Sequence, residues 1–66
     1  MPSRPQLLIA FAVQRCLEHC LASRAPLACM AEFLYELEYR GWSQEDVKEV
    51  ERRVVVRLYD KLSQER

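Results

Sequence analysis

The stretch LEYRGWSQEDV, residues 37–47, decides the fold of this 66-residue chain. Gly41 is the only glycine in the sequence, and it stands where a helix commonly ends in the left-handed backbone conformation. Trp42 follows at the position that usually contacts Leu37 in such an ending, the Schellman motif. Ser43 is a good N-cap for the next helix, and two acidic residues in that helix's first turn complement its dipole. The stretch therefore predicts two helices joined by a tight turn.

Apolar residues recur at spacings of three and four on both sides of this turn, which is the periodicity of amphipathic helices. The stripe before the turn contains Leu27, Met30, Phe33, Leu34 and Leu37. The stripe after it contains Val47, Val50, Val54, Leu58 and Leu62. These patterns predict helices near residues 26–40 and 43–63.

A third stripe lies near the N-terminus. Ser3 and Gln6 have the spacing of a capping box, and Pro5 fits a first helical turn. The residues that gather on one face are Ile9, Ala12, Val13, Cys16, Leu17 and Cys20. We expect a helix near residues 4–22, followed at residues 22–26 by either a turn or a kink before Pro26. The prediction is one all-α domain over residues 1–66, a small three-helix bundle.

Composition limits the function classes. Ten basic and ten acidic residues give no net charge, so no long-range attraction to nucleic acid or anionic lipid is expected. The apolar run from Leu7 to Val13 is too short to span a bilayer and lacks a cleavage site for a secretory signal. Three cysteines are an odd number, which indicates buried free thiols in a reducing compartment. We expect a cytoplasmic protein that does not contact membranes.

The first predicted helix carries more apolar surface than two partner helices can cover. Leu7, Leu8 and Phe11 lie outside its stripe, and Val56 faces away from the stripe of the third helix. Soluble monomers rarely expose a large apolar patch. These four residues are therefore our candidates for self-association, and we expect a homodimer.

Glu32, Tyr35, Glu36 and Tyr39 form a candidate surface for another protein, because amphipathic tyrosines are common at interfaces. The alternative to partner binding is a structural role, in which the two tyrosines are half-buried at the edge of the core.

A second interpretation is nucleic-acid binding. Residues around Gly41 resemble a helix-turn-helix over about twenty residues, with Leu37 before the turn and Val47 and Val50 as anchors after it. This resemblance implies that the second helix of the pair reads DNA, but its start is acidic. The candidate contacts lie further along, at Arg52, Arg53, Arg57 and Lys61.

A third interpretation is a metal site made from Cys16, His19, Cys20 and Cys29, which are zinc-ligating residue types. Their spacing matches no known zinc-finger pattern, and Cys16 and Cys20 lie on the apolar face, so we favour the interpretation that these cysteines belong to the core.

No nucleophile with an adjacent base and orienting group is present, and the chain has little room for a ligand cleft. We therefore expect no catalysis, cofactor or small-molecule substrate, and a small regulatory protein that acts through helix faces.

Overall fold

The computed structural model describes residues 4–64, and within this range all regular secondary structure is helical, with no strand. Helix α1 spans Gln6–Cys20, α2 spans Pro26–Tyr39 and α3 spans Gln44–Gln64. The prediction of an all-α, three-helix fold is confirmed. The β-branched triplet at residues 54–56 lies inside α3. The charged residues at helical spacing around it thus indicate its structure better than its own β propensity does.

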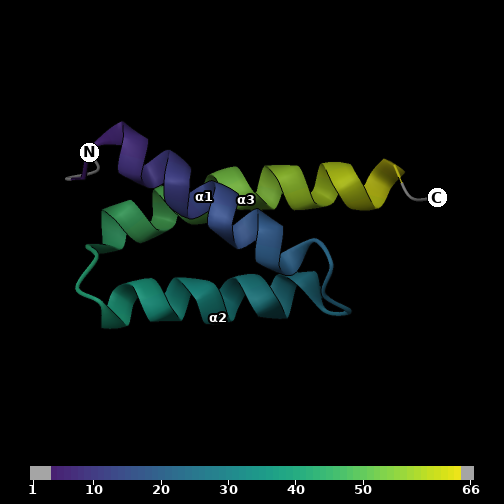
Figure 1. The fold of residues 1–66 in the computed structure, drawn as a ribbon, viewed down its shortest axis with the longest axis horizontal. Helices are drawn as coiled ribbons and strands as arrows, with labels where there is room; N and C mark the ends of the chain where they lie inside the picture. The colour runs from purple at the N-terminus through teal and green to yellow at the C-terminus, as the bar shows by residue number, and fades with distance from the viewer. Residues whose placement is uncertain (1–3, 65–66) are drawn as a thin grey trace.

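The three helices run in alternating directions (Figure 1). Helices α1 and α3 start at the same end of the molecule and cross each other, whereas α2 returns in the opposite direction below them. Each helix contacts both others. The last turns of α3 extend past the ends of the other two helices, which explains why Leu62 is 43% exposed although it belongs to the predicted stripe.

The core agrees closely with the predicted stripes. Every residue of the α1 stripe is buried, and from the other helices the buried apolar residues are Met30, Leu34, Leu37, Val47, Val50, Val54 and Leu58. The stripe of α2 extends less far than predicted, because Leu27 in its first turn is 42% exposed.

The start of α1 differs from the prediction. Pro5 precedes the helix as its N-cap, and its carbonyl oxygen accepts hydrogen bonds from the backbone N–H groups of Leu8 and Ile9 at 3.0 and 3.1 Å. None of the side chains in residues 4–64 caps this helix end. Ser3, the predicted cap, lies outside the described residues.

The link between α1 and α2 is a turn over residues 21–25, which resolves the choice between turn and kink. Pro26 occupies the first helical position, where its missing N–H costs nothing. The turn brings the Cα atoms of Cys20 and Cys29 to 5.5 Å, and the two residues form a disulfide bond.

The prediction that all three thiols are free is therefore wrong for two of them. An odd number of cysteines excludes complete pairing, but it does not exclude one bond. Cys16 is the free cysteine and is fully buried, as expected. Burial disfavours its thiolate and raises the pKa of Cys16 from 9.0 to about 11.

The link between α2 and α3 is held by backbone hydrogen bonds. Gly41 has a φ of +92°. The N–H of Trp42 donates to the carbonyl oxygen of Leu37 at 3.1 Å, and the N–H of Gly41 donates to that of Glu38 at 3.0 Å. These two bonds have the pattern of a Schellman motif. On the other side of the turn, the Ser43 hydroxyl oxygen accepts a hydrogen bond from a backbone N–H of the first turn of α3.

Candidate interaction surfaces

The four residues predicted for self-association are all exposed. Their exposed fractions are 84% for Leu7, 39% for Leu8, 62% for Phe11 and 65% for Val56. They do not lie in one hollow, because Leu8 and Phe11 line a groove between α1 and α2, whereas Val56 lines a groove between α1 and α3. Leu8 and Phe11 are thus separated from Val56 by α1 itself.

The α1–α2 groove has a volume of about 450 Å³ and is rich in aromatic side chains. Phe11 contributes from α1, and Phe33 and Trp42 contribute from the opposite wall. The guanidinium of Arg15 lies 5.9 Å from the centre of the Phe11 ring. An aromatic surface of this kind is suited to burial against another protein surface.

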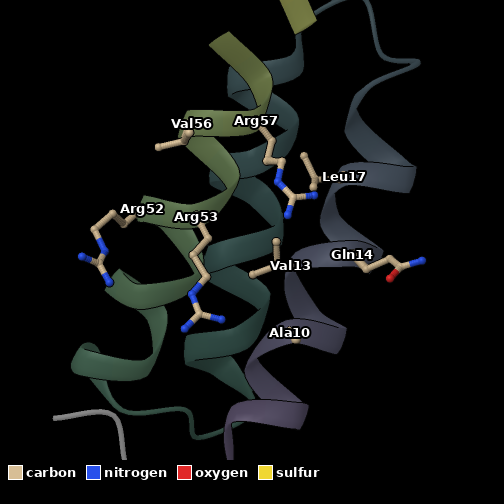
Figure 2. A pocket seen from close by; sticks show the side chains of 8 residues that line it. All are labelled: Ala10, Val13, Gln14, Leu17, Arg52, Arg53, Val56 and Arg57. Atoms are coloured by element: carbon tan, nitrogen blue, oxygen red, sulfur yellow. The ribbon is translucent and has the colours of Figure 1, made fainter. Parts of the chain in front are cut away.

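The α1–α3 groove is larger, at about 540 Å³, and has a different chemistry. Ala10, Val13 and Leu17 of α1 supply apolar side chains along one wall (Figure 2). Arginines of α3 supply the other wall, and Figure 2 shows the Arg57 guanidinium reaching across towards Leu17. Arg52 and Val56 point away from α1, so they lie at the outer rim.

Three of the four residues predicted for nucleic-acid contact lie around this groove, but two of them are already engaged. Arg52 donates to both carboxylate oxygens of Glu49 at 2.7 Å, and Arg53 donates to Glu49 Oε2 at 2.7 Å. Hydrogen bonds from Arg52 and then Arg53 lower the pKa of Glu49. Arg53 also donates to the Gln6 side chain at 2.6 Å. Lys61, the fourth residue of the set, is exposed further along α3 and does not line the groove.

The candidate partner surface on α2 faces solvent. Tyr35 is 70% exposed and Tyr39 is 83% exposed, so neither is half-buried at the core edge. Glu32 and Glu36 are exposed beside them, and Glu36 forms a salt bridge of 3.7 Å with Arg40 one turn away. The structure therefore brings the four predicted residues onto one accessible side of α2.

The candidate metal ligands are placed in a way that disfavours coordination. Cys20 and Cys29 are bonded to each other, so neither sulfur is available as a thiolate. His19 is exposed on α1. Across residues 4–64, no group of three or more histidine, cysteine, aspartate or glutamate side chains could hold a metal ion.

Asp46 is a feature that the sequence analysis assigned only to the helix dipole, yet it is completely buried. Its Oδ1 accepts a hydrogen bond from the backbone N–H of Arg4 at 3.3 Å, and its Oδ2 lies 3.8 Å from Arg4 Nε. The Arg4 guanidinium also lies 4.6 Å from the centre of the Trp42 ring. Asp46 thus attaches the segment before α1 to the junction between α2 and α3.

Comparisons of the chain with protein-family models, curated proteins and solved structures found no match. Among the helices of the described chain, none combines the length and the apolar character needed to cross a membrane.

Proposed function

We propose that this chain is a small, non-catalytic interaction protein that forms a homodimer and presents its helix faces to another protein. The observation that carries the proposal is the exposure of Leu7 and Phe11, at 84% and 62%, on the first helix of a domain this small. Burying each such side chain contributes roughly 1.5–3 kcal/mol. That is a large share of the stability that a short chain can reach.

The proposed dimer interface is centred on α1 and the groove between α1 and α2. Leu8 and Phe11 line this groove together with half-buried Phe33 and Trp42, so a second copy would cover a continuous aromatic surface. Val56 lies at the other groove and points away from α1, so its contact in a dimer is proposed from its exposure alone. The turn at Gly41 supports the interface indirectly, because it fixes the position of Trp42 between α2 and α3.

Sedimentation velocity at micromolar concentration tests the dimer. We expect the wild-type chain to sediment as a dimer and Phe11→Glu to sediment as a folded monomer. Tyr35→Glu is the matched control, because it introduces the same charge at an exposed aromatic residue on α2. A wild-type monomer, or a Phe11→Glu variant that still dimerises, contradicts the proposed interface.

The partner surface is proposed to be Glu32, Tyr35, Glu36 and Tyr39, whose exposed tyrosines and carboxylates suit a polar and aromatic contact. The helix-turn-helix interpretation has less support, because Glu49 accepts hydrogen bonds from two of the arginines that would bind phosphate. Retention on heparin that depends on Arg57 would revive it.

The cytoplasmic location remains a prediction, and it depends on the state of the cysteines. Disulfides persist mainly in oxidising compartments, so a cytoplasmic chain would hold Cys20 and Cys29 as thiols. Alkylation of free thiols in freshly lysed native cells, followed by mass spectrometry, distinguishes one free cysteine from three.

A further inference from the structure

We propose that the Cys20–Cys29 disulfide is a thiol–disulfide exchange site, which small cationic thiols attack at the Sγ atom of Cys29. This inference goes beyond the proposed function, because it assigns a reaction to a bond that neither interaction surface uses. The bond lies at the end of the bundle where α1 ends and α2 begins (Figure 1). A hollow of about 490 Å³ opens there between the two helices.

The two cysteines differ in access. Cys20 is 0% exposed and does not line the hollow, whereas Cys29 is partly exposed and forms part of its wall. The wall also contains Ala25 and Ala28, whose small side chains leave room for a molecule of a few heavy atoms. Exchange requires the attacking thiolate to reach one sulfur of the bond, and the hollow offers this approach at Cys29.

The exchange takes two balanced steps. In the first, the thiolate of a small thiol RSH forms a bond to Cys29 Sγ, the bond between the two cysteines breaks, and Cys20 Sγ leaves with the electron pair and takes up a proton. In the second, the thiolate of another RSH attacks the external sulfur of this mixed disulfide, and Cys29 Sγ leaves and is protonated. Two RSH are thus oxidised to RSSR while the disulfide is reduced to two thiols.

Access and leaving-group chemistry favour different sulfurs in the first step. Cys29 is the fourth residue of α2, where the helix dipole stabilises a thiolate. Cys29 would therefore be the better leaving group, which favours attack at Cys20. The complete burial of Cys20 opposes that attack. In the second step Cys29 is itself the leaving group, so the dipole then assists its release.

The charge around the hollow selects the incoming thiol. Glu32 follows Cys29 by three residues on the same face of α2, and both line the hollow together with Glu36. Glu36 is partly compensated by Arg40 at 3.7 Å. No lysine or arginine of residues 4–64 lines the hollow, and its one basic side chain is the imidazole of His19. A thiol that carries an ammonium group is therefore attracted, and an anionic thiol is repelled.

The test uses the oxidised full chain and two probes, cysteamine and 2-mercaptoethanesulfonate, which carry an ammonium and a sulfonate group. Acid stops the reaction, a maleimide blocks the free thiols, and mass spectrometry locates the mixed disulfide. Cleavage after Arg24 places Cys20 and Cys29 in different peptides. Each rate is divided by the rate of the same thiol with a neutral small-molecule disulfide, which cancels intrinsic reactivity. We expect the first adduct on Cys29 and a normalised rate about threefold higher for cysteamine.

Charge variants separate recognition from simple access. Glu32→Lys places an ammonium group in the hollow and should reverse the preference between the two thiols. Glu51→Lys is the matched control, because Glu51 is an exposed carboxylate at a different groove, between α2 and α3, and it should retain the preference. Phe11 does not line the hollow, so Phe11→Glu should react like the wild type. Failure of the proposed dimer therefore leaves this inference intact.

Three results would overturn the proposal. The first is an adduct that forms on Cys20 as often as on Cys29. The second is an equal normalised rate for the two thiols that Glu32→Lys does not change. The third is a reaction only at urea concentrations that unfold the chain, because the bond would then be attacked in the unfolded state and the hollow would play no part.

Discussion

The two links between helices are closed by different means. Between α2 and α3, two backbone hydrogen bonds and a left-handed Gly41 complete the turn, and all the residues involved are close in sequence. Between α1 and α2, none of the described side chains caps the start of α2, where Ala25 is the N-cap residue. The covalent Cys20–Cys29 bond instead joins the end of α1 to the first turn of α2. The first link is stabilised by local contacts of the folded state, whereas the second also restricts the unfolded chain. The two should therefore respond to different perturbations.

The largest expected effect is the loss of the disulfide. Cys20 and Cys29 are nine residues apart, and a loop of this size corresponds to about 3 kcal/mol of chain entropy in the unfolded state. We expect the Cys20→Ser/Cys29→Ser double variant to lose about this amount in urea unfolding. A reductant should lower the melting temperature of the wild type but leave that of the double variant unchanged. If oxidised and reduced wild-type chains melt together, the bond does not stabilise the fold.

The link between α2 and α3 could be predicted from the sequence, because its chemistry is local. Glycine, the following tryptophan and the serine cap occupy positions that helix ends require, and helical periodicity predicts the core faces. The salt bridges of Glu49 with Arg52 and Arg53 could also be predicted from the sequence, since they have the i,i+3 and i,i+4 spacings of a helix.

The disulfide could not be deduced in the same way. Cys16 and Cys20 lie one helical turn apart on the same buried face, so the sequence offers two possible partners for Cys29. The course of residues 21–25 selects Cys20. The burial of Asp46 likewise depends on Arg4, which is 42 residues away. The grooves depend on how whole helices pack, and no pattern within one helix predicts their shape or the residues that line them.

A smaller effect should come from Cys16, which lies one turn before the disulfide. Its pKa of about 11 in the folded chain is above the ordinary value of 9.0. The neutral thiol therefore contributes stability that is fully present below pH 9 and is lost as the pH rises from 9 towards 11. Between pH 8 and pH 10 this amounts to about 1 kcal/mol.

Urea unfolding of the wild type and of Cys16→Ala at both pH values measures this contribution as the difference between the two chains. A titration of the Cys16 Cβ chemical shift in the folded protein checks the cause directly. A midpoint near pH 9 would mean that the core tolerates the thiolate, and that burial does not raise the pKa of Cys16.

A similarly small effect is expected for Gly41→Ala, which tests the other link. A Cβ at position 41 would meet no atom within 4 Å, so no clash contributes. Only the φ of +92° opposes the substitution, and forcing alanine into this region should cost about 1 kcal/mol. Asparagine tolerates left-handed conformations better than alanine does, so Gly41→Asn should lose less stability although its side chain is larger. The free energy of unfolding from urea titrations should therefore rank glycine first, asparagine second and alanine third. Equal losses for asparagine and alanine would show that side-chain size, rather than backbone conformation, determines what this link accepts.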